Sequence, residues 1–156
     1  TCTRNQEPGM SSEGFRFCHS VRVRYAEIDG QMIVFNSHYL TYLDIGITEY
    51  FRNLGLSFGT PGEKPIFDFA LVKTTLEFKG SGFFDDILNI YVKVSKLGNS
   101  SFVTNFMIRK EGETSPIVLA ESIYAGYDME TKRSVPIPET VRNLIETFES
   151  TAPVLA

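Results

Sequence analysis

Residues 23–56 contain the groups whose types and spacing are best suited to chemistry. A strand pattern ends there in an acidic loop with Asp29 at its tip, and a long amphipathic segment begins at Asn36 or Ser37. The start of a helix presents N–H groups without intrahelical partners and carries a partial positive charge. A carboxylate beside such donors suits acyl chemistry, because the carboxylate attacks or activates water while the donors hold a developing oxyanion.

Position alone leaves two interpretations of Asp29, a solvated turn residue or a catalytic carboxylate. Glu27 precedes it by two residues and is expected to form a structural pair with Arg22 or Arg24. His38 falls in the first helical turn, where we expect a surface or packing role rather than general-base catalysis. Packed or solvated roles are also expected for His19, Asp44 and Glu49.

Composition and charge argue against several classes of function. The chain has 156 residues and a net charge of −4, whereas a nucleic-acid surface needs a clustered basic excess. It has no run of about 18 apolar residues that could cross a membrane. Cys2 lies in the polar first residues and Cys18 in a predicted strand, so we expect no structural disulfide and a cytoplasmic location. With two histidines and no Cys/His cluster at ligand spacing, no metal site is expected.

The pattern of apolar residues predicts strands and two helices. Residues 15–25 alternate between apolar and polar side chains, as expected of a strand with one buried face. Residues 37–53 carry an apolar stripe at helical spacing, with Asn36 or Ser37 able to cap its start and Gly55 suited to its end. Four further strand-like runs and a short terminal helix follow, at residues 70–78, 87–94, 102–108, 117–127 and 139–148.

Short links between the later strands favour antiparallel neighbours, because a parallel crossover needs about a dozen residues or more. A single sheet cannot bury both faces alone, so the long helix is expected to pack across one of them. The sequence therefore predicts an α+β fold with one domain at residues 15–150, a flexible leader at 1–14 and a flexible tail at 151–156. Apolar residues on both faces of residues 102–108 indicate that a second subunit covers part of the other face.

The stretch from residue 25 to residue 56 also follows one motif without a gap. Its residues are Tyr25, Glu27 and Asp29, then Ile33-Val34-Phe35, Asn36 and Tyr39, and further along Tyr42-Leu43-Asp44, Glu49-Tyr50-Phe51 and Gly55-Leu56. In this motif the chain resembles the hotdog-fold acyl-CoA thioesterases, specifically the 4-hydroxybenzoyl-CoA thioesterase branch and its YbgC-like relatives. The family usually carries glycine in a D-x-x-G turn after the aspartate, whereas Gln31 and Met32 follow Gly30 here.

The resemblance implies a hotdog fold, in which a five-stranded antiparallel sheet wraps around a long central helix and a short C-terminal helix follows. It implies a homodimer or homotetramer formed by joining sheets edge to edge, with active sites at the dimer interface. It also implies a reaction that needs neither a cofactor nor a metal.

By the same resemblance, Asp29 is the catalytic carboxylate, acting as nucleophile or as general base on water. The backbone N–H of Asn36 is expected to hold the thioester carbonyl oxygen. Gln31 is a candidate to place its side-chain amide at that carbonyl, and Phe35 is a candidate to line the acyl pocket. One strand–turn–strand is expected to bind the phosphates of coenzyme A through Lys93, Lys96 and Ser100.

The leading hypothesis is therefore an acyl-CoA thioesterase that hydrolyses a thioester to a free acid and coenzyme A. The alternative is a non-catalytic hotdog module that binds acyl-CoA or an acyl-carrier protein. Hydration or dehydration of acyl-CoA, a third option, requires a histidine placement that this sequence lacks. The acyl group, the carrier and the choice between dimer and tetramer stay open at this point.

Overall fold

The structure, a computed structural model, describes residues 14–155 and contains two α-helices and six strands, which confirms the α+β class. The elements follow in the order β1 (Phe17–Arg22), a 3₁₀ turn (Tyr25–Glu27), α1 (His38–Asn53), β2 (Phe69–Phe78), β3 (Ile87–Leu97), β4 (Ser101–Lys110), β5 (Pro116–Asp128), β6 (Arg133–Ser134) and α2 (Glu139–Thr151). Residues 1–13 of the predicted leader lie outside the described residues.

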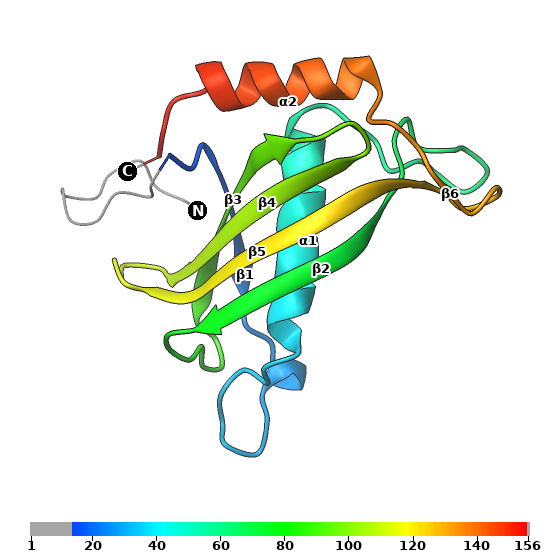
Figure 1. The fold of residues 1–156 in the computed structure, drawn as a ribbon. Coiled ribbons are helices and arrows are strands. Elements are labelled where there is room, and N and C mark those ends of the chain that lie inside the picture. The colour runs from blue at the N-terminus through cyan, green and yellow to red at the C-terminus, as the bar shows by residue number, and fades with distance from the viewer. Residues whose placement is uncertain (1–13, 156) are drawn as a thin grey trace.

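The strands form one antiparallel sheet in the order β1-β3-β4-β5-β2 (Figure 1). The antiparallel pairing predicted from the short links is confirmed. The number of strands is not, because β6 pairs with the end of β5 and makes a sixth strand where five were predicted. Two residues are too few to show an alternation of apolar and polar side chains, so β6 leaves no pattern in the sequence.

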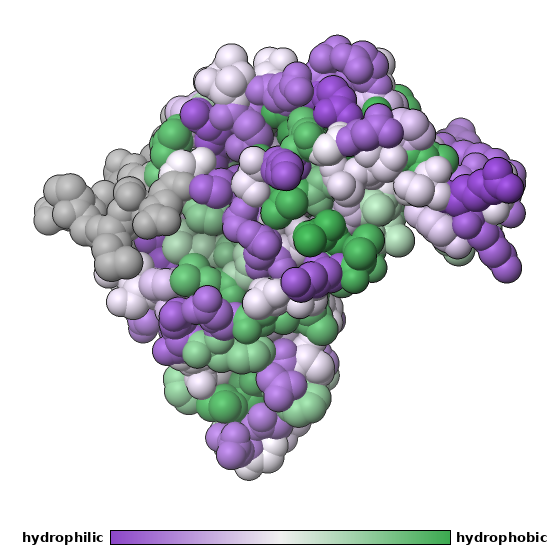
Figure 2. Space-filling view, in the orientation of Figure 1, coloured by the Kyte–Doolittle hydropathy of each residue, from purple (hydrophilic) through white to green (hydrophobic). Residues whose placement is uncertain are grey.

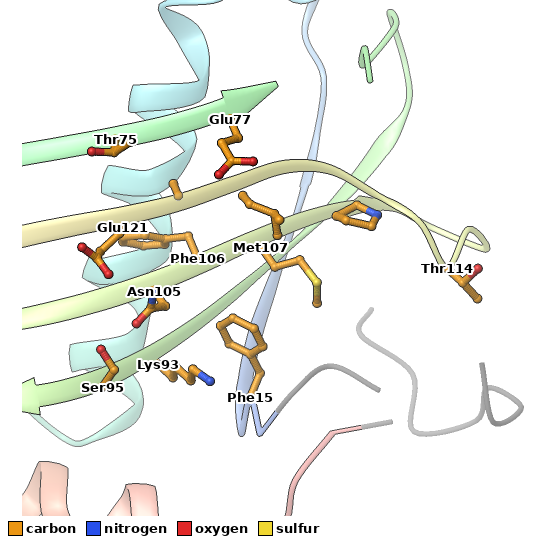
Figure 3. A pocket seen from close by; sticks show the side chains of 13 residues that line it. Phe15, Thr75, Glu77, Lys93, Ser95, Asn105, Phe106, Met107, Thr114 and Glu121 are labelled. Carbon is orange, nitrogen blue, oxygen red and sulfur yellow. The ribbon is translucent and has the colours of Figure 1, made fainter. Parts of the chain in front are cut away.

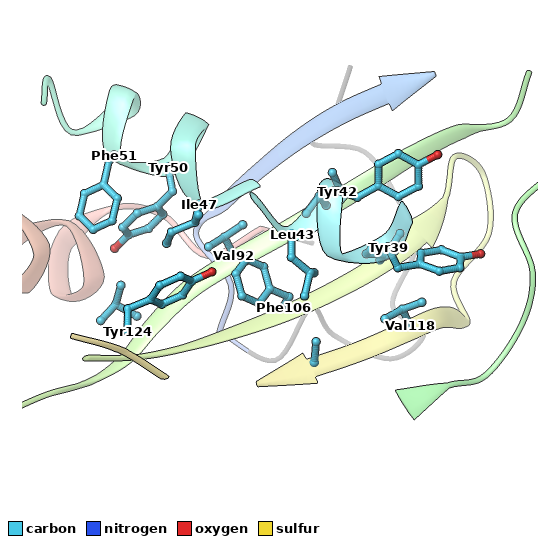
Figure 4. Close-up of a cluster of buried hydrophobic side chains, with 14 of the residues drawn as sticks. Tyr39, Tyr42, Leu43, Ile47, Tyr50, Phe51, Val92, Phe106, Val118 and Tyr124 are labelled. Carbon is cyan, nitrogen blue, oxygen red and sulfur yellow. The ribbon is translucent and has the colours of Figure 1, made fainter. Parts of the chain in front are cut away.

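Helix α1 packs against one face of this sheet (Figure 4). Its buried residues are Tyr39, Tyr42, Leu43, Gly46, Ile47, Tyr50 and Phe51, which all belong to the stripe predicted from the sequence. Gly46 permits the close approach, because a Cβ there would lie 2.8 Å from Cγ2 of Ile90 and 3.1 Å from Cγ2 of Val92. Burial of one large apolar side chain contributes about 1.5–3 kcal/mol, so this stripe holds the helix to the sheet.

Strands β1 and β2 are the two edges of the sheet. β2 exposes apolar side chains, with Leu71 51% exposed, Val72 64% and Phe78 53%. Figure 2 has the orientation of Figure 1 and shows patches of hydrophobic surface between hydrophilic residues over the strands. An exposed strand edge with apolar side chains is a template for pairing with another strand.

Helix α2 is joined to the rest of the fold through Glu149. One oxygen of this carboxyl accepts hydrogen bonds from the Tyr50 hydroxyl (2.6 Å) and from the Val94 N–H (3.0 Å). The helix runs to Thr151, three residues beyond the predicted end at Phe148. Glu149 therefore connects α2 to both α1 and β3.

Cys18 in β1 is disulfide-bonded, so the prediction that the chain has no structural disulfide is wrong. The cysteines accordingly give no support to the expected cytoplasmic location. Among residues 14–155, no helix combines the length and the apolar character that crossing a membrane requires.

Candidate active site

The loop between β1 and α1 folds into a tight hairpin around Asp29. Ile28 and Val34 form an antiparallel bridge across its base. The Asp29 N–H donates to the Ile33 carbonyl (2.9 Å), and the Met32 N–H donates to the Asp29 carbonyl (2.9 Å). The backbone of Asp29 is therefore fixed through both its N–H and its carbonyl group.

The Asp29 side chain is half-buried at this turn. Its Oδ1 accepts a hydrogen bond from the Gln31 N–H (2.7 Å), which orients the carboxylate. Its Oδ2 accepts no hydrogen bond from any residue between 14 and 155. One oxygen thus orients the group, and the other is available to water or to a substrate.

Met32 stands where the resembling family usually carries glycine, three residues after the aspartate. Its φ of +64° lies in the left-handed region, which costs a non-glycine residue about 1–2 kcal/mol. The hairpin therefore keeps the shape that glycine favours, although the side chain there is a methionine.

The two amides that directly precede Asn36 are committed to hydrogen bonds. The Val34 N–H donates to the Gly82 carbonyl (2.9 Å), and the Phe35 N–H donates to the Glu27 carbonyl (2.9 Å). The N–H groups of Asn36 itself and of Ser37 donate to no group in the described part of the chain.

These two amides lie at the start of α1, which begins at His38 with Ser37 as its N-cap. Ser37 thus takes the N-cap position, one of the two predicted alternatives, but its side chain makes no capping hydrogen bond. A helix start with unused donors binds an anion or a developing oxyanion. The site therefore combines a carboxylate with free amide donors seven and eight residues further along the chain.

A second loop, residues 79–86, supports this hairpin. Gly82 accepts the Val34 N–H, and its own N–H donates to the Tyr39 hydroxyl (3.0 Å). Ile33 and Phe83 form a further antiparallel bridge between the two loops. Because Tyr39 belongs to the first turn of α1, both loops are tied to the start of the helix.

Glu27 is buried, at 3% exposure, in the 3₁₀ turn that precedes the hairpin. Its Oε1 accepts hydrogen bonds from the Arg24 N–H (2.8 Å) and from Nε of Arg24 (3.1 Å). Burial by itself raises the pKa of Glu27, but these bonds outweigh it and leave that pKa lowered. The predicted structural pair therefore forms with Arg24 rather than with Arg22, whose charged partner is Asp85.

The two predicted substrate-binding residues of the hairpin are solvent-exposed. Phe35 is 45% exposed, and its ring lies 6.1 Å from that of His38. Gln31 uses its backbone N–H on Asp29, and its exposed side chain has no hydrogen bond within the described residues. Both side chains are therefore accessible from solvent at the hairpin.

The predicted phosphate-binding residues lie far from Asp29 within one chain. β3 starts at the loop that supports the hairpin and runs for 11 residues, roughly 35 Å, to the turn that contains Ser100. Lys96 is exposed near the end of β3. Lys93 lies on the sheet face turned away from α1, with its Nζ 4.9 Å from the centre of the Phe15 ring, and lines a hollow of about 570 Å³ (Figure 3).

Tyr39 at the start of α1 takes part in this arrangement in a way that sequence reasoning missed. It was counted in the apolar stripe and in the family motif, yet its hydroxyl accepts a hydrogen bond from the Gly82 N–H of the second loop (3.0 Å). A buried tyrosine hydroxyl usually finds a polar partner, so tyrosine rather than phenylalanine at this position was the available signal. No group of three or more metal-ligating side chains gathers anywhere in residues 14–155.

Comparisons with known proteins bear on this arrangement. The model of the thioesterase-like superfamily matches residues 23–145, which include the hairpin, α1 and the strands β2 to β6. The acyl-CoA thioesterase YbgC of Haemophilus influenzae is 26% identical over 133 residues, which cover 85% of this chain and 95% of the relative.

Solved structures share the fold at lower identity. A thioesterase from Thermus thermophilus complexed with coenzyme A and zinc has a TM-score of 0.74 at 22% identity, covering 88% of this chain and 97% of that one. A 1,4-dihydroxy-2-naphthoyl-CoA thioesterase from Synechocystis has a TM-score of 0.73 at 17% identity, covering 83% and 94%. The match to the family model covers well over half of the chain, so this chain belongs to the thioesterase-like superfamily, and its prediction as a thioester hydrolase with a hotdog-like fold is confirmed.

Proposed function

We propose that the chain is an acyl-CoA thioesterase in which Asp29 supplies the catalytic carboxylate and the Asn36 amide binds the thioester carbonyl oxygen. The observation that carries the proposal is the pair of unused N–H groups at the start of α1, among neighbours that are all hydrogen-bonded. The oriented Asp29 carboxylate, with one oxygen unused among the described residues, supports it.

The reaction adds water across the thioester and releases a carboxylic acid and coenzyme A. As general base, Asp29 takes a proton from water while the water oxygen attacks the carbonyl carbon, and the C–S bond then breaks. As nucleophile, Asp29 attacks the carbonyl carbon and expels coenzyme A as its thiolate, which forms an anhydride that water hydrolyses in a second step to the free acid and the Asp29 carboxylate. In both cases the carbonyl oxygen gains negative charge, and one fixed amide donor lowers the barrier by about 3 kcal/mol.

A second copy of the chain completes the site in this proposal. The Phe78 end of β2 contacts Tyr39, 5.6 Å between ring centres, and so lies beside the hairpin. The Phe69 end pairs with Gly126, whose N–H donates to the Ser100 carbonyl (2.7 Å). Antiparallel pairing of two β2 edges about a twofold axis brings the Ser100 side of one subunit towards the Asp29 hairpin of the other.

This geometry accounts for the distance between the two halves of the predicted site. Coenzyme A is a long molecule, and its phosphates can reach a turn on one subunit while its thioester lies at the hairpin of the other. Lys96 and Ser100 are the candidates for binding the phosphates at that turn. Lys93 faces away from α1 and is a weaker candidate for this role. Relatives of similar fold are described as complexed with coenzyme A, which supports this carrier.

The experiment that tests the proposal is hydrolysis of an acyl-CoA panel by the intact chain, with release of the free thiol as the readout. The panel includes aryl, short-chain, medium-chain and long-chain thioesters, and each is paired with the matching acyl-carrier protein thioester. We expect turnover of at least one CoA thioester. Binding across the panel with no thiol release contradicts the proposed function.

A charge on the β2 edge is expected to separate the subunits. Val72→Glu places a carboxylate in an exposed apolar edge, twice per dimer, and loss of an interface contact of this type costs about 2 kcal/mol or more. In size-exclusion chromatography with light scattering, the mass is expected to fall from a multiple of 17.6 kDa to 17.6 kDa.

The matched control is Val154→Glu, the same exchange at another exposed valine. It is expected to keep the mass of the unmodified chain. Specific activity of Val72→Glu should fall by about tenfold or more at concentrations where the parent chain is associated. The reason is that a loss of about 1.4 kcal/mol in the free energy of association lowers the association constant tenfold. A monomeric Val72→Glu variant with full activity contradicts a shared site.

A further inference from the structure

Three hydrogen bonds close a ring that contains the Asn36 nitrogen. The Tyr39 N–H donates to the Asn36 carbonyl (3.3 Å), and the Tyr39 hydroxyl accepts the Gly82 N–H (3.0 Å). The Gly82 carbonyl accepts the Val34 N–H (2.9 Å), and the chain from Val34 to Asn36 completes the ring. The proposed oxyanion donor therefore belongs to a closed structure rather than to a free loop.

One of these three bonds depends on the identity of a side chain. The other two join backbone groups that every residue except proline carries. The Tyr39 side chain is buried, at 2% exposure, and its hydroxyl points out of the cluster of buried side chains (Figure 4). Phenylalanine at this position would fill the same apolar space but would leave the ring open. Tyr39 is thus the residue through which the sequence closes the ring.

The ring also reaches the arm of the hairpin that carries Asp29. Ile28, directly before Asp29, forms an antiparallel bridge with Val34. Because the Val34 N–H donates to the Gly82 carbonyl, Val34 lies between the Asp29 arm and the second loop. A displacement of Gly82 is therefore passed through Val34 to both reacting groups.

We infer that Tyr39 is a positioning residue, whose hydroxyl closes the ring and so holds the Asn36 N–H in the orientation that binds the thioester carbonyl oxygen. The inference rests on the proposed function of Asp29 and Asn36. In this role Tyr39 touches none of the reacting atoms and acts through Gly82 and Val34. A donor that is fixed before the reaction stabilises the developing charge without reorganisation, which is the physical advantage of the ring.

The first experiment compares Tyr39→Phe with Tyr50→Phe. Both variants remove a hydrogen-bonded hydroxyl from a buried tyrosine of α1, one from the ring and one from the bond to Glu149 (2.6 Å). Both should melt at a lower temperature, because each loses a hydrogen bond to a polar group. For Tyr39→Phe we also expect kcat to fall about 10-fold to 100-fold, since displacement of a catalytic group by about 1 Å costs up to about 100-fold. For Tyr50→Phe kcat should be unchanged.

The comparison of kcat with KM separates positioning from a merely structural role. The carbonyl oxygen gains its negative charge in the transition state, so a misaligned donor lowers kcat and changes KM by less than about threefold. A kcat of Tyr39→Phe equal to that of the parent chain overturns the inference. An equal loss of kcat in Tyr39→Phe and Tyr50→Phe also overturns it.

A second pair of variants strains the ring while Tyr39 stays in place. A Cβ at Gly82 would lie 3.1 Å from Cγ2 of Val34 and 3.5 Å from the Tyr39 hydroxyl, so Gly82→Ala forces the ring apart slightly. Gly80→Ala is the matched control, because a Cβ there would also lie 3.1 Å from its nearest neighbour, Cγ2 of Ile117, outside the ring. We expect kcat to fall about threefold or more in Gly82→Ala and to be unchanged in Gly80→Ala. Equal kcat values in these two variants contradict the role of the ring.

Amide hydrogen exchange separates failure of this inference from failure of the proposed function. The Val34 N–H keeps its own acceptor in Tyr39→Phe, so its exchange rate reports whether the ring acts as a unit. We expect it to exchange at least about fivefold faster in Tyr39→Phe than in Tyr50→Phe, whatever the activity. A chain that hydrolyses no thioester but shows this difference contradicts the proposed function and supports the ring. Unchanged Val34 exchange in an active Tyr39→Phe variant contradicts the positioning role alone.

Discussion

Asp29→Asn should lower kcat for thioester hydrolysis by about 10³-fold or more, which corresponds to about 4 kcal/mol in the activation barrier. An amide neither attacks a carbonyl carbon as a carboxylate does nor accepts a proton from water, so both proposed roles are lost. The measurement is thiol release in the steady state, with the substrate that the acyl-CoA panel identifies.

The fold should be unchanged in this variant, because the asparagine side chain still carries an oxygen for the Gln31 N–H that Asp29 now accepts. Asp85→Asn is the matched control. Asp85 is exposed and has a φ of +67°, a conformation that asparagine adopts readily, so the same charge is removed without strain. Full activity in Asp29→Asn, or an equal loss in Asp85→Asn, contradicts the assignment of Asp29.

A single turnover in ¹⁸O-labelled water distinguishes the two roles of Asp29. If Asp29 is the nucleophile and water then attacks the anhydride at the Asp29 carboxyl carbon, the label enters the protein at Asp29. If Asp29 is a general base, the label enters the released acid alone. Water that attacks the acyl carbon of an anhydride also labels the acid, so trapping of an acylated chain with hydroxylamine completes the test.

The sequence carried enough information to locate the principal candidate groups and the helix that presents them. The apolar stripe of α1 was predicted at residues 37–53, because the spacing of buried side chains on a helix follows from its geometry alone. An acidic loop with Asp29 at its tip was predicted, and the structure shows that this loop is a hairpin in which Met32 has a φ of +64°, in the left-handed region that favours glycine.

What the sequence could not show are contacts between residues distant along the chain. Gly82 supports the start of α1 through Tyr39, 43 residues away, and no local pattern encodes such a distance. The prediction that Asn36 or Ser37 caps α1 follows a statistical preference, and Ser37 does take the N-cap position, but the side-chain hydrogen bond that usually comes with it is absent, so the backbone N–H groups of Asn36 and Ser37 stay unused among the described residues. These are the features that give the site its free donors.

Glu149 in α2 also contacts residues that are distant along the chain, so the sequence does not indicate its contribution to stability. Glu149→Ala removes the acceptor for the Tyr50 hydroxyl and for the Val94 N–H, both of which are buried. Each buried donor left without a partner costs about 1–3 kcal/mol. We expect the free energy of unfolding in urea to fall by about 2–4 kcal/mol, with kcat of the folded chain unchanged.

Glu149→Gln is the matched control, since the glutamine oxygen can still accept from Tyr50 and Val94. It should therefore cost less than half as much as the alanine exchange. Equal losses in the two variants would show that packing of the side chain, rather than its hydrogen bonds, holds α2 in place.

The pH dependence of stability gives an independent test of Glu149. Burial raises its pKa above the ordinary value of 4.5, although the bonds from Tyr50 and Val94 oppose the shift. Between 4.5 and the raised value the folded chain binds more protons at this group than the unfolded chain, so its contribution to stability falls as the pH rises. The stability of the parent chain relative to Glu149→Gln should therefore be greatest and constant below about pH 4.5, decline through that window and then stay constant, as urea unfolding at a series of pH values can establish.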